Sequence, residues 1–125
     1  MNDLQQTIEA RRALGVAVCQ RITETIVKLG YALRDDIGVP RFEQARFELV
    51  TDPYSQSRDL VGFWHDLDQQ RIGQIRFHGD GTFFAEYDIV RPHPSKPDCF
   101  VEAINAWGNA GKISSEAKLL AMASD

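Results

Sequence analysis

Two alternating segments joined by a glycine-rich turn, at residues 71–90, constrain the fold more than any other part of the sequence. Apolar and polar residues alternate on both arms, as in half-buried strands, and the glycines of the turn let the chain reverse at little steric cost. A two-residue turn would place Phe77 opposite Phe84 and mix the two faces, whereas a three-residue turn at 79–81 pairs Phe77 with Phe83. Because a slip of one residue moves every side chain to the other face, the three-residue turn is predicted.

The segment before this hairpin predicts a third strand in the same sheet. We expect Val61, Phe63 and Leu67 to join the apolar face, with Phe63 opposite Ile75 across a loop at 68–70. The other face then carries a mixed set of side chains: Leu60, Gly62, Trp64, Ile72, Gln74, Arg76, His78, Phe84, Glu86 and Asp88. A solvated sheet face is normally polar throughout, so this mixed face is unusual.

A long N-terminal helix is predicted to begin at Asn2 or Asp3 and to end at Gly30. Its apolar residues recur at helical spacing: Leu4, Ile8, Leu14, Val18, Ile22, Ile26 and Leu29. Gly15 interrupts this helix at a cost of about 1 kcal/mol relative to alanine. We favour the interpretation that this glycine is simply tolerated; the alternative is that it marks the close approach of a partner helix.

A fourth strand is predicted at 42–51, where Ala45, Phe47 and Leu49 alternate with polar residues. It follows a connecting segment, 31–41, in which Leu33 and Ile37 are expected to turn inward. Consecutive strands joined by short loops form a meander. After the fourth strand of the meander, three prolines in 91–98 are expected to lead the chain off the sheet.

The remainder of the chain predicts two helices. Phe100, Val101, Ile104 and Trp107 follow helical spacing, with Ser95 as a start and Gly108 or Gly111 as a stop. A short terminal helix is expected at 116–122. The predicted fold class is therefore α+β, with a long N-terminal helix, a four-stranded antiparallel meander, a C-terminal helix and a short terminal helix in a single domain, 1–125.

Composition excludes several classes of function. The net charge is −4, and lysines and arginines are spread along the chain, so the basic patch of a nucleic-acid-binding protein is missing. No stretch of eighteen apolar residues and no apolar leader occurs, which predicts a cytoplasmic protein with no membrane partner. Cys19 and Cys99 match no metal or redox spacing and are expected to be buried free thiols.

The three histidines do not predict a metal site or any cofactor. His65 shares the parity of Phe63 and is expected to be a hydrogen-bonded histidine at the edge of the core. His78 lies on the mixed face beside the turn, and His93 lies in the proline-rich segment. A two-histidine site with Asp80 or Asp88 is a weaker alternative, because no metal-ligand spacing is present.

The mixed face holds the candidate site residues. Glu86 and Asp88 project from the same side of one strand, and with His78 they are the candidates for acid/base catalysis. The alternative is a structural ladder of charges across the strands, which stabilises a sheet by a few tenths of a kcal/mol to about 1 kcal/mol per pair. The candidates for a binding or interface role are Trp64, Arg76, Phe84 and Glu86, with Arg76 expected to pair with Glu86.

These residues favour a small non-catalytic binding or regulatory module over an enzyme. Apolar area on a second sheet face, without a recognisable catalytic set, is typical of an interaction surface. The expected partner is a second copy of the chain or another protein. The alternative is a small enzyme or small-molecule-binding protein with a pocket on the mixed face, and a third hypothesis is an acidic partner that masks a basic protein.

Overall fold

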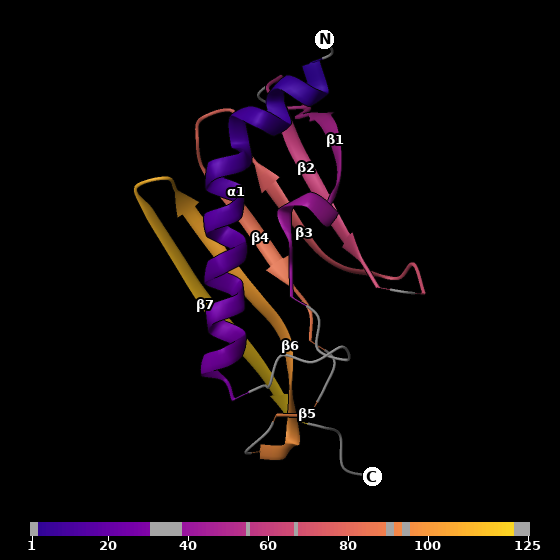
Figure 1. The fold of residues 1–125 in the computed structure, drawn as a ribbon, viewed down its shortest axis with the longest axis vertical. Helices are drawn as coiled ribbons and strands as arrows, with labels where there is room; N and C mark the ends of the chain where they lie inside the picture. Colours follow the sequence, from indigo (N-terminus) through magenta and orange to yellow (C-terminus); the bar gives the residue numbers. More distant parts are fainter. Residues whose placement is uncertain are drawn as a thin grey trace.

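The computed structural model describes residues 3–30, 39–54, 56–66, 68–89, 92–93 and 96–121. One long helix, α1 (Asp3–Lys28), packs on one face of an antiparallel sheet (Figure 1). In the described residues, six strands form a meander: β1 (Arg46–Thr51), β2 (Arg58–His65), β3 (Arg71–Phe77), β4 (Phe83–Tyr87), β6 (Lys96–Asn109) and β7 (Lys112–Ala121). A two-residue strand, β5 (Pro92–His93), pairs with the first part of β6, and a short 3-10 helix, η1 (Phe42–Gln44), precedes β1.

Several expectations fall on parts of the chain that the structure does not describe. They are the inward positions of Leu33 and Ile37 and the apolar position of Leu67. The expectations for the side chains of His93 and Cys99 also lie outside the described part of the structure, although their backbones lie in β5 and β6.

The N-terminal helix confirms the expected boundaries. It ends close to Gly30, whose φ of +98° is the left-handed conformation that glycine adopts easily at a helix end. Its buried stripe consists of Gly15, Val18, Cys19, Ile22 and Ile26. A stripe at this spacing lets the helix bury one side against the sheet while its other side stays in water.

The hairpin of β3 and β4 has the predicted register. Phe77 pairs with Phe83, and Ile75 pairs with Ala85. The turn between them is closed by a hydrogen bond from the amide of His78 to the carbonyl of Thr82, at 2.8 Å. Both predicted pairs of apolar side chains therefore face α1.

The predicted register of β2 against β3 is wrong by one residue. Gly62, and not Phe63, lies opposite Ile75, and a β-bulge interrupts the pairing between Trp64 and His65. Such a bulge adds a residue on one strand, so counting back from the loop assigns the strand to the wrong face. Leu60 and Trp64 therefore join the core, at 1% and 3% exposure.

The predicted C-terminal helices are absent, because residues 96–121 form the hairpin of β6 and β7. Within β6, Ile104 and Ala106 are buried while the residues between and after them point away from the core. The carboxamide oxygen of Asn109 accepts hydrogen bonds from the amides of Gly111 and Lys112 and so organises the turn. Residues 104–108 also pair with β4, which satisfies the backbone groups along that edge.

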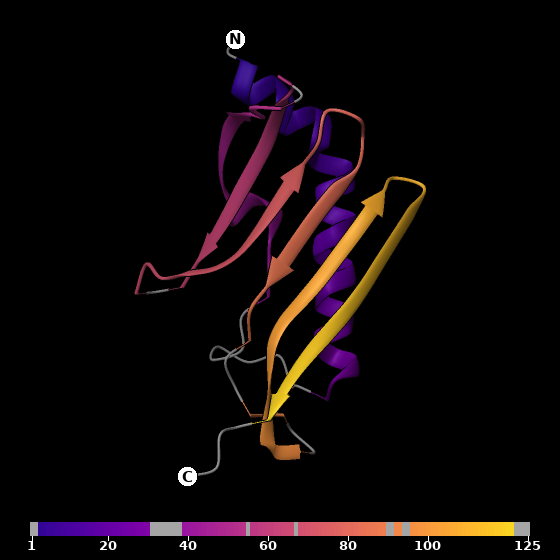
Figure 2. The same ribbon diagram turned by 180° about the vertical axis from the view of Figure 1, so that it is seen from behind.

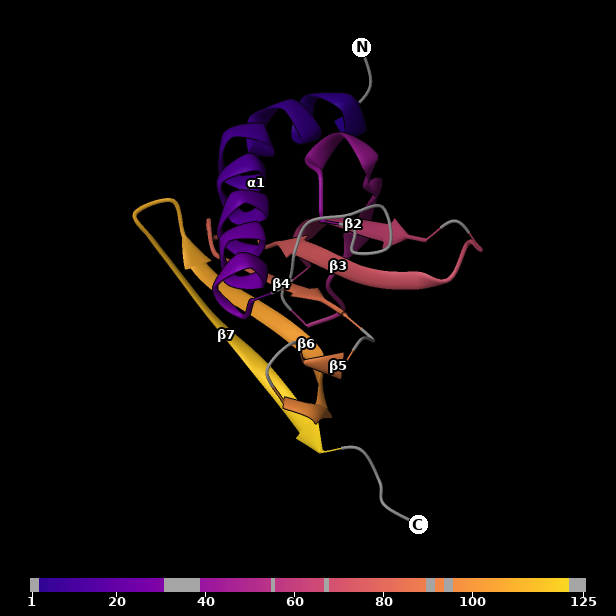
Figure 3. The ribbon, with the colours of Figure 1, turned by 60° about the horizontal axis from the view of Figure 1, so that its bottom comes forward.

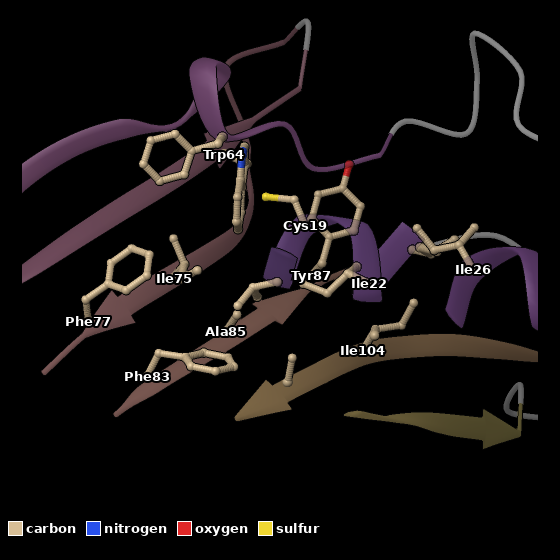
Figure 4. Packing of buried hydrophobic residues seen from close by; sticks show 14 of the residues in the cluster. Cys19, Ile22, Ile26, Trp64, Ile75, Phe77, Phe83, Ala85, Tyr87 and Ile104 are labelled. Atoms are coloured by element: carbon tan, nitrogen blue, oxygen red, sulfur yellow. The ribbon is translucent and has the colours of Figure 1, made fainter. Parts of the chain in front are cut away.

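The core lies between α1 and the sheet. Side chains from β3, β4 and β6, among them Ile75, Ala85, Tyr87 and Ile104, point towards the buried stripe of the helix (Figure 4). The helix also reaches the last hairpin (Figure 3), where Ser115 of β7 accepts a hydrogen bond from Arg21 Nε at 3.0 Å and lies 3.2 Å from the Thr25 hydroxyl. Segments from both halves of the sequence thus share one core.

Gly15 has a packing role, contrary to expectation. A Cβ atom at this position would lie 2.3 Å from two ring carbons of Phe42, which is 2% exposed. The absence of a side chain lets η1 dock against the middle of the helix. Among the residues that the structure describes, neither helix has an apolar stretch that could cross a membrane.

Candidate binding face

The sheet face opposite α1 is called the open face here, because no element among the described residues covers it (Figure 2). Strand register places five of its side chains in one row across the sheet. Neighbours in this row are opposite each other on adjacent strands, in the order Glu48, Val61, Arg76, Phe84 and Trp107. The predicted mixed face therefore exists, although its members on β2 differ from those expected.

Two aromatic side chains lie beside each other on the open face, close to the turns that end β3 and β6. Phe84 and Trp107 are directly opposite in the register of β4 and β6, and each is 39% exposed. Trp107 was expected to be buried on a helix, and it is here because β6 is a strand. Large aromatic side chains contribute strongly to binding when a partner covers them.

Trp64, a predicted interface residue, is not on this face. It lies in the core, with its ring 6.0 Å from that of Tyr87, and its indole nitrogen donates a hydrogen bond to the carbonyl of Arg41 at 2.9 Å. Its position follows from the register of β2. The other three predicted binding residues, Arg76, Phe84 and Glu86, do lie on the open face.

A buried carboxylate, Asp59, anchors one side of the open face. Its side chain is 1% exposed, and its Oδ2 atom accepts hydrogen bonds from Arg76 Nε at 2.8 Å and from His78 Nδ1 at 3.2 Å. Ser57 Oγ lies 3.4 Å from the other oxygen. Arg76 is therefore paired with Asp59, and the expected pairing with Glu86 is wrong.

The protonation of this cluster follows from its contacts. Burial alone would raise the pKa of Asp59, but the hydrogen bonds and charges of Arg76 and His78 outweigh burial and hold that pKa below its ordinary value. Its two partners, Arg76 and His78, are 36% and 39% exposed, which limits the effect of burial. Because an ionised carboxylate can only accept, Nδ1 of His78 carries a proton.

Glu86 and Asp88, two of the candidate catalytic residues, line a shallow hollow together with Arg71, Gly73 and Gln74. Its volume is about 230 Å³, below the range of roughly 300–1,000 Å³ that is usual for small-molecule sites. The third candidate, His78, belongs to the Asp59 cluster and not to this hollow. The three residues therefore do not form one catalytic constellation.

A larger hollow of about 580 Å³ lies on the other side of the molecule, between α1 and residues 39–43. Cys19 lines it, and burial raises the pKa of the Cys19 thiol to about 12. A thiol with that pKa is protonated at neutral pH and is a poor nucleophile or metal ligand. Cys19 is a buried free thiol, as expected.

His65 differs from the expected hydrogen-bonded histidine. Its Nδ1 atom, beside the bulge of β2, is buried without a hydrogen-bond partner among the described residues. Within the described ranges, no three histidine, cysteine, aspartate or glutamate residues are grouped so as to hold a metal ion.

Asp59 and Trp107 are the residues of this face that sequence reasoning missed. Asp59 lies two residues before Val61 on β2, so its side chain projects from the same face as that of Val61. Assigning Leu60 and Trp64 to the core would therefore have placed Asp59 on the open face. Trp107 would have been found from the turn at 109–111, which is typical of a hairpin. No family model, no curated protein and no solved structure matches this chain.

Proposed function

We propose that the protein is a non-catalytic binding module that pairs with a second copy of itself through the open face. The observation that carries this proposal is the pair Phe84 and Trp107, which are adjacent in register on that face and each 39% exposed. Sheets that bury two faces do so by packing each face against another layer. Here α1 supplies the layer for one face, and a second copy supplies it for the other.

The charges of the open face suit association between identical surfaces. Cationic and anionic side chains are interspersed across it, with Arg46 and Glu48 on β1, Arg76 and Glu86 at the centre, and Lys112 and Glu116 on β7. A face of one sign would repel its own copy, whereas a mixed face places opposite charges within reach across a twofold axis. Arg76 is held in place by Asp59 at 2.8 Å, so it loses little side-chain entropy on association.

The alternative, a small enzyme or small-molecule-binding protein, has less support. The hollow beside Glu86 and Asp88 is small and open, and His78 is engaged with Asp59 outside it. An acid/base site needs its groups within hydrogen-bond reach of the same reacting atom. These groups line different parts of the face.

Sedimentation velocity at micromolar concentration tests the proposal. We expect the wild-type chain to sediment as a dimer, and Trp107→Ala and Phe84→Ala each to shift it towards monomer. Tyr54→Ala is the matched control, because Tyr54 is 96% exposed in the turn between β1 and β2, away from the centre of the open face. A wild-type monomer, or a dimer that both open-face variants leave intact, would contradict the proposal. Circular dichroism on each variant separates loss of association from loss of folding.

A further inference from the structure

We infer that Arg76 and His78, aligned by the buried carboxylate of Asp59, form a binding site for a carboxylate group. The site itself is independent of self-association. The inference rests on the proposed function only for the molecule that supplies the carboxylate, which in a dimer is the second copy.

The guanidinium of Arg76 is fixed in a way that leaves its outer edge available. Its Nε donates to Asp59 Oδ2 at 2.8 Å, and no described residue bonds to its two Nη groups. The side chain is 36% exposed. Two parallel N–H groups on a planar fork match the two oxygens of a carboxylate, and prior fixation of the fork reduces the entropy lost on binding.

His78 is held at its ring and at its backbone. Nδ1 donates to Asp59, the amide donates to Thr82, and the carbonyl accepts a hydrogen bond from Arg11 Nη2 of α1 at 3.2 Å. Because His78 is two residues after Arg76, both side chains project from the same face. With Nδ1 occupied and the side chain 39% exposed, Nε2 is the ring nitrogen left for a ligand. It is a lone pair when the ring is neutral and a donor when the ring is protonated.

The carboxylate should therefore bind better when His78 is protonated. The charged groups that face the ring are Asp59 on β2, Arg76 on β3 and Asp80 in the turn, while Arg11 approaches its carbonyl from α1. One oxygen of Asp80 is already engaged by the amide and hydroxyl of Thr82, at 2.9 and 2.6 Å. Asp80 is thus held in the turn by Thr82, although its charge also acts on His78. Among the described residues, no hydrogen bond joins Asp80 to the second ring nitrogen of His78, which leaves that nitrogen to a bound anion.

The surroundings favour a carboxylate attached to an apolar group. Phe84 is opposite Arg76 in the register, and Trp107 is one strand further on. An anion bound to Arg76 can therefore place an apolar neighbour over the two rings. In the proposed dimer the open face of the second copy offers carboxylates for this site, namely those of Glu48, Glu86 and Glu116.

The test is an NMR titration of the histidine ring resonances with sodium acetate, in the wild-type chain and in monomeric Trp107→Ala. Acetamide, which is neutral and of similar shape, and inorganic phosphate are titrated in parallel at constant ionic strength. In Trp107→Ala we expect saturable shifts at His78 with acetate and none with acetamide. Wild-type chain should bind acetate more weakly, because in the dimer the second copy already supplies a carboxylate. The ring of His65, at the far end of β2, is the internal control.

Asp59→Asn and Arg76→Lys separate this site from non-specific charge. Both should weaken acetate binding, the first because the alignment is lost and the second because lysine lacks the planar fork. Equal shifts with acetamide, unchanged binding in Asp59→Asn, or phosphate binding as tight as acetate would each overturn the inference. Sedimentation of the wild-type chain reports on self-association separately, so failure of the dimer and failure of the carboxylate site are distinguishable.

Discussion

Replacing Arg76 with methionine should destabilise the protein far more than its partly exposed position suggests. Methionine keeps most of the apolar stem that covers Asp59 but removes the charge that compensates it. Breaking a buried ion pair by removing one partner typically costs 3–5 kcal/mol. Because His78 Nδ1 at 3.2 Å and Ser57 Oγ at 3.4 Å remain beside the carboxylate, we expect about 2–4 kcal/mol here.

The assay is thermal and urea unfolding at a fixed protein concentration and neutral pH. For a domain of this size 1 kcal/mol corresponds to about 4 °C, so the expected fall in Tm is roughly 8–16 °C. The matched control is Arg58→Met. Arg58 pairs with Asp3 at 3.2 Å, but both side chains are more than half exposed, so that change should cost less than about 1 kcal/mol.

The double variant Asp59→Asn/Arg76→Met completes a thermodynamic cycle. Once Asp59 is neutral, loss of the arginine leaves no uncompensated buried charge, so the double variant should be more stable than Arg76→Met alone. If Arg76→Met unfolds within about 1 kcal/mol of wild type, or if the two changes are additive, the assignment of Asp59 as a buried partner is refuted.

Three further predictions concern other parts of the structure. Gly15→Ala should destabilise the protein in urea unfolding by about 1–2 kcal/mol, because the clash with Phe42 outweighs the gain in helix propensity; an increase in stability would contradict this packing. Folding lowers the pKa of Asp59, so the stability advantage of wild type over Asp59→Asn should be full near neutral pH and should be lost as pH falls below the ordinary aspartate pKa. The test is the Tm of both proteins from pH 7 to pH 2.5, and a constant difference in Tm would refute this prediction. In a Cys99→Ser variant, labelling by a thiol reagent reports on Cys19 alone. Because the pKa of the Cys19 thiol is raised to about 12, it should react at pH 8 only after the protein unfolds. Rapid labelling of the folded chain would contradict this prediction.

Local sequence patterns predicted those parts of the fold in which one pattern was decisive. The spacing of apolar residues from Leu4 to Leu29 fits only a helix, and α1 is found at Asp3–Lys28. The parity of the two arms around 79–81 admits a single register that keeps apolar side chains together, and Phe77 pairs with Phe83 as predicted. In both places local preference and burial agree.

The errors arose where a pattern had two solutions. Phe100, Ile104 and Trp107 suit a helix, but Ile104 and Ala106 also alternate, and pairing with the edge of β4 decides in favour of a strand. In β2 the bulge at Trp64 and His65 leaves no mark in the spacing of apolar residues. That error moved Trp64 to the wrong face and hid Asp59, so the mixed face was predicted without the carboxylate that organises it.

The hydrogen bonds that join Arg21 and Thr25 of α1 with Ser115 of β7 affect the order in which the chain can fold during synthesis. α1 leaves the ribosome before any strand, yet part of its apolar stripe is covered only by β6 and β7, the last strands described. At about 5–20 residues per second, the nascent helix therefore carries an uncovered apolar side for several seconds. During that interval the uncovered side of the helix is exposed to aggregation and to chaperones in general, until the hairpin of β6 and β7 packs against it.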